Sequence, residues 1–125
     1  HKLIEKFDIR SGQGASTITR SMSGGNQQKV IIAREISKEP DVLIAVQPTR
    51  GLDVGSIEYI HKRLVEQRDS GKAVLLVSLE LDEILNVSDR IAIVNNGELI
   101  GIVNASETDE NEVGLMMAGI KRGEA

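Results

Sequence analysis

The sequence predicts an α/β fold with a mainly parallel sheet, flanking helices and a terminal antiparallel hairpin. Two short, continuous apolar runs, Val42–Val46 and Ala73–Val77, have the length and composition of strands in a parallel sheet. Between them, Ser56–Gln67 repeats apolar residues at helical spacing. Near the C-terminal end, Asn96-Gly97 is a two-residue signal for a hairpin turn. Strand, helix and strand in this order predict a βαβ unit.

The segments before the first strand are predicted to be a helix end, a loop and a longer helix. His1–Phe7 places its apolar residues on one side, and residues 11–19 are rich in Gly, Ser and Thr. Ser23 is a good helix cap, and an apolar stripe that includes Ala33 and Ile36 follows it.

The two strands are expected to be buried on both faces, because apolar residues occupy every position along them. Pro40 ends the preceding helix, and Gly71 ends the helix between the strands. After the second strand, the sequence predicts a short helix, two strands that pair in a hairpin, and a helix whose first turn is acidic. Their expected ranges are Leu81–Asn86, Arg90–Val94, Glu98–Val103 and Asp109–Met117.

Composition excludes several classes of function. The 125 residues carry a net charge of -4 and only 2% aromatic residues, which argues against a nucleic-acid-binding surface. There is no cysteine, so disulfides and thiolate metal sites are excluded. The apolar runs of about five residues are far shorter than the ~20 that a membrane-spanning helix needs. If this protein works at a membrane, we expect it to bind there through a partner.

The predicted fold is incomplete for a nucleotide-binding protein. The sequence has no phosphate loop of the form G-x-x-x-x-G-K-[ST] and too few strands for a full nucleotide-binding sheet. It begins with His1 and not with Met. We therefore expect the chain to be part of a longer protein.

Several motifs occur in a specific order. Ser23-Gly24-Gly25-Asn26-Gln27-Gln28-Lys29 resembles the signature loop of ATP-binding-cassette (ABC) proteins. The residues from Gln47 to Asp53 resemble the end of that family's Walker B strand and its D-loop. Val77–Glu80 and Ser88–Ile91 resemble the switch strand and the strand after it. The resemblance runs from Leu3 to Gly119. It implies that residues 1–22 end a helical subdomain and that residues 23–125 form the C-terminal part of the core, without the Walker A part.

Within that family, the chain resembles more closely the second cassette of twin-cassette importers for simple sugars and nucleosides. Asn26 in the signature and Arg50 in Pro-Thr-Arg-Gly-Leu-Asp indicate that branch. The resemblance implies a subunit that binds and hydrolyses ATP with Mg²⁺ at the cytoplasmic face of the membrane. Its implied partners are a second cassette and transmembrane permease subunits.

The signature residues suit an anion. Glycines that open a helix expose backbone N–H groups at the positive end of its dipole, and Ser23 adds a hydroxyl. The resemblance implies that Ser23, Gly24, Gly25 and Asn26 contact the γ-phosphate of ATP held by the opposite cassette. The alternative is an ordinary capped helix. The next three residues, Gln27 to Lys29, are interpreted as a solvated helix face without a chemical role.

Three positions where the family carries catalytic residues differ here. Val46 and Gln47 stand where Walker B has Asp and Glu, and Leu79 stands where the switch His is expected. The hypothesis is that this cassette's own ATP site hydrolyses poorly or not at all, and we expect no metal ligand in this chain. The alternative is that Val46 and Gln47 are simply a strand end and a turn.

Asp53 resembles the D-loop aspartate at the interface between cassettes, and it also suits a cap of the next helix. Glu80 is interpreted as a helix cap or a first-turn charge, His61 as a solvated residue, and Met116 and Met117 as packing residues.

Two other functions remain open from the sequence. One is an ABC ATPase of translation or DNA repair, and the other is a non-catalytic interaction module. The isolated chain is expected to be inactive and to self-associate through an exposed apolar sheet edge.

Overall fold

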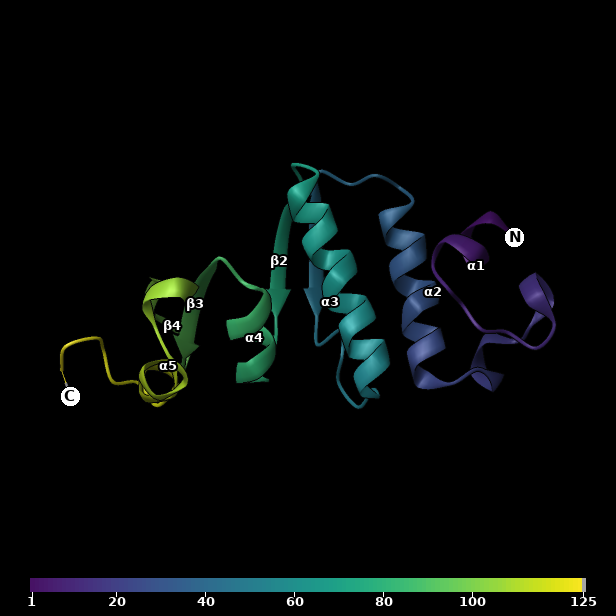
Figure 1. The fold of residues 1–125 in the computed structure, drawn as a ribbon. Coiled ribbons are helices and arrows are strands. Elements are labelled where there is room, and N and C mark those ends of the chain that lie inside the picture. The colour runs from purple at the N-terminus through teal and green to yellow at the C-terminus, as the bar shows by residue number, and fades with distance from the viewer. Residues whose placement is uncertain (125) are drawn as a thin grey trace. The chain divides into compact units, whose positions relative to one another are not determined.

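Two separate hydrophobic cores organise the chain. The computed structural model describes residues 1–124, which divide into one unit up to Val77 and a second unit from Ser78 onward. Figure 1 shows the elements of each unit.

The first unit contains the βαβ arrangement that the sequence predicts. Its strands β1 and β2 pair in parallel, with Val42 opposite Ala73 and Val46 opposite Val77. Single 3₁₀ turns at Gly14–Ser16 and Thr19–Ser21 occupy the expected loop. The helices and strands are α1 (Lys2–Lys6), α2 (Gly24–Ile36), β1 (Val42–Val46), α3 (Val54–Asp69) and β2 (Ala73–Val77).

Helices α2 and α3 lie side by side, and the core of the first unit forms between them and β1 (Figure 1). The buried core residues are Phe7, Ile9, Ala33, Ile36, Leu43, Ile60 and Leu64. Phe7 and Ile9 come from the N-terminal segment, so this segment is packed against α2 and α3. This packing fixes residues 7–10 close to the first turns of α2.

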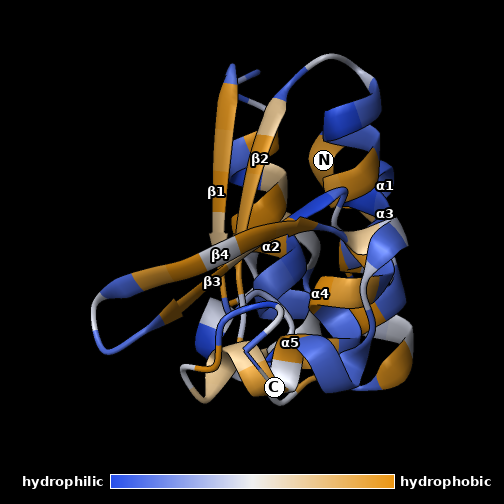
Figure 2. Ribbon diagram, turned by 90° about the vertical axis from the view of Figure 1, so that its left-hand side faces the viewer, coloured by the Kyte–Doolittle hydropathy of each residue, from blue (hydrophilic) through white to orange (hydrophobic). Residues whose placement is uncertain are grey.

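The expectation that both strands are buried on both faces is wrong for the described residues. Successive side chains of a strand point to opposite faces. In β1 and β2 one face packs toward the helices, and the residues of the other face remain 45–63% exposed. The large apolar residues of this face are Val42, Ile44, Val46, Leu75 and Val77, and we call them the open sheet face. Figure 2 shows the apolar character of both strands.

The second unit is a hairpin packed with two helices. Strands β3 (Arg90–Asn95) and β4 (Glu98–Asn104) pair antiparallel, with an irregular register between Ile93 and Val94. Asn96 and Gly97 both have positive φ, which confirms the predicted turn. The helices are α4 (Leu81–Val87) and α5 (Glu110–Met117), with a 3₁₀ turn at Ala105–Glu107. The core consists of Ile91, Ile93, Val103, Val113 and Met116.

Capping residues set where two helices begin. Helix α3 begins two residues before the predicted start because the carboxylate of Asp53 caps it. Helix α5 begins after Asp109, whose side chain accepts a hydrogen bond from the N–H of Glu112 at 2.9 Å. Met116 is buried as expected, whereas Met117 is 37% exposed. Among residues 1–124, no helix is both long enough and apolar enough to cross a bilayer.

Candidate functional site

The N-terminus of α2 presents the serine and glycines that the sequence singles out. Ser23 is the N-cap residue, and its Oγ accepts a hydrogen bond from the N–H of Asn26 at 3.3 Å. The first N–H groups of any helix have no acceptor within the helix, so this end is rich in hydrogen-bond donors. Ser23 and Gly24 are exposed, whereas Gly25 is buried. The exposed part of the loop can therefore meet a ligand from solvent.

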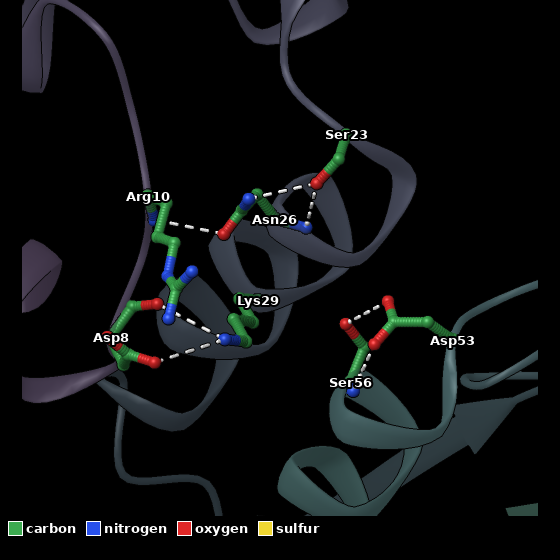
Figure 3. A network of polar contacts seen from close by, with 7 residues as sticks. All are labelled: Asp8, Arg10, Ser23, Asn26, Lys29, Asp53 and Ser56. Carbon is green, nitrogen blue, oxygen red and sulfur yellow. Dashed lines mark hydrogen bonds and ion pairs between the residues drawn. The ribbon is translucent and has the colours of Figure 1, made fainter.

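Asn26 uses both ends of its side-chain amide within the chain (Figure 3). Its Oδ1 accepts a hydrogen bond from the backbone N–H of Arg10 at 2.9 Å. Its Nδ2 donates to Ser23 Oγ, also at 2.9 Å. Asn26 thus joins the N-terminal segment to the capping serine.

The two glycines have different surroundings. A Cβ on Gly25 would lie 3.0 Å from the Cβ of Ser56 and closer still to its hydroxyl. A Cβ on Gly24 would meet only Leu52, at an ordinary 3.5 Å. Packing inside the chain therefore requires glycine at position 25 but not at position 24.

Asp53 lies beside the same glycine. Its two carboxylate oxygens accept hydrogen bonds from Ser56, from the hydroxyl at 2.8 Å and from the backbone N–H at 3.0 Å (Figure 3). The hydrogen bond from the Ser56 side chain, followed by the one from its backbone, lowers the pKa of Asp53 below its ordinary value. The expected cap of the next helix is confirmed. The structure therefore places Asp53 close to Gly25 of the predicted signature loop.

The interpretation of the next residues as a solvated helix face is wrong. Gln28 donates to the carbonyl of Pro48 at 2.7 Å, and Gln27 donates to the carbonyl of Met22 at 2.9 Å. The side chain of Lys29 is only 11% exposed. Its ammonium donates to the carbonyl of Asp8 at 3.2 Å, lies 3.4 Å from an Asp8 carboxylate oxygen and sits 4.5 Å from the Tyr59 ring centroid.

The sequence contains a signal for the burial of Lys29. The buried residues of α2 are Gly25, Lys29, Ala33 and Ile36, which repeat at helical spacing. Lys29 therefore lies on the buried face of the helix by position alone. The sequence contains no comparable signal for the roles of Arg10 and Ser56 in supporting the loop, because these roles depend on contacts with distant segments.

Strand β1 ends in an unusual backbone conformation. Gln47 has φ +49°, in the left-handed region that non-glycine residues seldom adopt. Its N–H donates to the carbonyl of Val77 at 2.8 Å, which continues the parallel ladder past the strand end. Val46 belongs to the open sheet face. Gln28 contacts the next residue, Pro48, so α2 and this strand end are directly linked.

In the second unit, Leu79 is 72% exposed. Glu80 occupies the N-cap position of α4, as expected, but its side chain makes no capping hydrogen bond. The hydroxyl of Ser78 accepts a hydrogen bond from the N–H of Glu80 at 3.0 Å instead.

Comparison with known proteins finds relatives of this chain. The nucleoside import ATP-binding protein NupA of Lactococcus lactis is 61% identical over 118 residues, which are 94% of this chain and 23% of NupA. The guanosine import ATP-binding protein NupO of Bacillus subtilis is 59% identical over 98% of this chain and 24% of NupO. The chain is a homologue of ABC import ATP-binding proteins. It spans about a quarter of the length of these relatives.

Solved structures of ABC cassettes also match the chain. The ATP-binding cassette MJ0796, in a dimeric post-hydrolysis state bound to ADP and phosphate, matches with a TM-score of 0.72 and 27% identity. The match covers 83% of this chain and 44% of that cassette. The chain therefore has part of the α/β fold of an ABC cassette, as predicted. No protein-family model matches the chain.

The end of β1 lacks the ligands that a magnesium ion prefers. Magnesium prefers carboxylate oxygens, and Val46 and Gln47 offer no carboxylate. Within residues 1–124, no cluster of three or more His, Cys, Asp or Glu side chains could hold a metal ion. The loop at the start of α2, by contrast, fits a phosphate group, because Gly24 leaves its backbone open to close approach.

Proposed function

We propose that this chain is part of the ATP-hydrolysing subunit of an importer for nucleosides or simple sugars, and that it contributes the signature loop to a composite ATP site. The observation that carries the proposal is the exposed, donor-rich start of α2, where Gly24 leaves the backbone open. Relatives named for nucleoside and guanosine import, at 61% and 59% identity, support the nucleoside branch. A relative from Haloferax volcanii named for glucose import is 47% identical.

The loop would act on the γ-phosphate of ATP bound by a second cassette. The first N–H groups of α2 and the hydroxyl of Ser23 all donate, and phosphate oxygens all accept. Each hydrogen bond to a charged group contributes roughly 1.5–3 kcal/mol. ATP would therefore favour the closed pair of cassettes, and loss of the γ-phosphate would loosen it, because only the difference in affinity shifts such an equilibrium. Permease subunits would receive this motion.

The ATP site on this cassette's own side is proposed to be impaired. Val46 cannot bind a metal ion, and Leu79 cannot hydrogen-bond a phosphate. Gln47 can hydrogen-bond a water molecule but cannot take its proton, and a general base typically contributes 10²–10⁴-fold to a rate. We propose that the competent site takes its phosphate loop, Mg²⁺ ligands and base from the other cassette and its signature from this chain.

The proposed organisation follows from the same resemblance. Residues 1–22 would end the helical subdomain, and residues 23–125 would form the signature helix and the C-terminal part of the core. The full-length subunit would bind the cytoplasmic face of the membrane through its permease partners. The isolated chain would not hydrolyse ATP. NupA, NupO and the Haloferax relative are all named for import, which supports transport over translation or DNA repair.

Replacing Ser23 with arginine in the full-length protein tests this proposal. The long cationic side chain would fill the space that the γ-phosphate needs, so we expect ATP turnover to fall more than tenfold. Asn111→Ala is the control, because Asn111 is exposed on α5 in the second unit. Unchanged turnover in Ser23→Arg would reject the role of this loop in the working ATP site.

A further inference from the structure

We propose that Asn26 is a positioning residue that makes the hydroxyl of Ser23 a dedicated hydrogen-bond donor toward the bound phosphate. This inference rests on the proposed function of the loop. It gives Asn26 a role that acts through Ser23, because Oδ1 accepts from Arg10 and one N–H of Nδ2 donates to Ser23 within the chain.

The orientation of the Asn26 amide follows from its neighbour. The backbone N–H of Arg10 can only donate, so the group that faces it at 2.9 Å must be the side-chain oxygen. The Nδ2 group therefore faces Ser23, where it donates to Oγ at 2.9 Å (Figure 3). The contact with Arg10 thus determines which atom of Asn26 reaches the serine.

The two hydrogen bonds from Asn26 fill the acceptor capacity of the serine. A hydroxyl oxygen has two lone pairs and one proton. One lone pair of Ser23 Oγ accepts from the backbone N–H of Asn26 at 3.3 Å, and the other accepts from its Nδ2 at 2.9 Å. The remaining capacity is the O–H itself, which must donate to a group outside this pair. Ser23 is exposed, so the proton can reach a ligand.

In this arrangement the loop offers hydrogen-bond donors to a ligand. With the serine restricted to donation, its O–H and the first backbone N–H groups of α2 are all donors. Such a loop favours a phosphate, which only accepts, over water, which does both. A serine without Asn26 beside it could turn its proton toward other acceptors and would lose this preorganisation.

A carboxylate at position 26 should turn the Ser23 hydroxyl away from the phosphate. Aspartate has nearly the shape of asparagine and can still accept from the N–H of Arg10. Its second oxygen, however, can only accept, so it would accept the hydrogen bond from the Ser23 hydroxyl and compete with the phosphate for it.

The test is a double-mutant cycle on ATP turnover of the full-length protein, with Ser23→Ala, Asn26→Ala and the double variant. We expect Ser23→Ala to lower turnover about tenfold, as the loss of one hydrogen bond to a charged group does. Asn26→Ala should lower it several-fold when Ser23 is present and less than twofold when Ser23 is already alanine, because coupled residues are not additive. The turnover of the Asn26→Asp variant should fall at least as far as that of Ser23→Ala. Asn111→Asp is the matched control.

The outcomes separate the two proposals. If Ser23→Ala leaves turnover unchanged, both the loop's function and the role of Asn26 are overturned. If Ser23→Ala is impaired but Asn26→Ala has the same effect in both backgrounds, Asn26 has only a structural role and this inference alone fails. Wild-type turnover in Asn26→Asp would also overturn it, and that variant keeps the test decisive if Asn26→Ala does not fold.

Discussion

Gly24 and Gly25 are neighbours in one loop, but only Gly25 is required by packing inside the chain. Gly25 has no room for a side chain because Ser56 of α3 lies against it. Gly24 has that room inside the chain, and the proposed function gives glycine there the advantage of close approach of a phosphate to the backbone. Under the proposed function, the two glycines would therefore serve packing at position 25 and binding at position 24.

Gly25→Ala should destabilise the chain. The added methyl group would overlap the side chain of Ser56 and disturb its hydrogen bonds to Asp53, and overpacking of this kind costs about 1–3 kcal/mol. Gly24→Ala is the matched control and should change the free energy of unfolding by less than about 0.5 kcal/mol, as exposed substitutions usually do. Urea unfolding of both variants measures the difference. Equal stability of the two variants would contradict the contact with Ser56.

At single residues, the sequence predicted the parts that depend on local chemistry. Ser23 and Asp53 cap their helices as their residue types suggest. The contacts of Gln28 and Lys29 with Pro48 and Asp8 were not predictable, since they depend on which distant segment lies opposite the helix.

At the scale of elements, α2 is held in place by polar contacts as well as by its apolar stripe. Gln28 ties it to the end of β1, and Lys29 ties it to the segment after α1. Lys29 also packs its ammonium over the ring of Tyr59, which adds a cation–π contact. The orientation of the loop at the start of α2 therefore depends on two neighbouring segments.

Lys29→Ala should lower the free energy of unfolding by about 2 kcal/mol, because it removes a buried charge-assisted hydrogen bond and the packing of the side-chain stem. Lys38→Ala is the control. Lys38 forms an exposed ion pair with Glu35, and such pairs contribute only ~0–1 kcal/mol. Denaturant unfolding of the two variants compares them directly. A smaller effect for Lys29→Ala than for Lys38→Ala would show that the buried contacts do not stabilise the helix.

The order and type of the elements were predictable, because hydrophobic periodicity, prolines and the Asn96-Gly97 turn are properties of short stretches. Which face of β1 and β2 is covered was not predictable. Apolar residues occupy both faces of these strands, and only the packing of α2 and α3 distinguishes one face from the other.

At the scale of the whole chain, the open sheet face is an apolar surface that the described residues leave exposed. Five aliphatic side chains on two adjacent strands are exposed there, and contiguous apolar surface of this kind favours association. The isolated chain should therefore form dimers or larger species.

Ile44→Lys should reduce this association. Ile44 lies in the middle of β1 and is 62% exposed, so a lysine can be accommodated while its charge opposes apolar contacts. Light scattering over a range of concentrations should show a mass that rises for the wild-type chain and stays closer to the monomer for the variant. A wild-type chain that remains monomeric at high concentration would contradict this prediction.

The central claim is that the start of α2 contacts the terminal phosphate of ATP. Its most direct test is the alkylation rate of a thiol introduced by Ser23→Cys in the full-length protein, with Asn111→Cys as the control and any other cysteines replaced. A non-hydrolysable ATP analogue should slow alkylation at position 23 more than tenfold, whereas ADP should not, and neither should change the rate at position 111. Equal rates at position 23 with the analogue, with ADP and without nucleotide would contradict the claim.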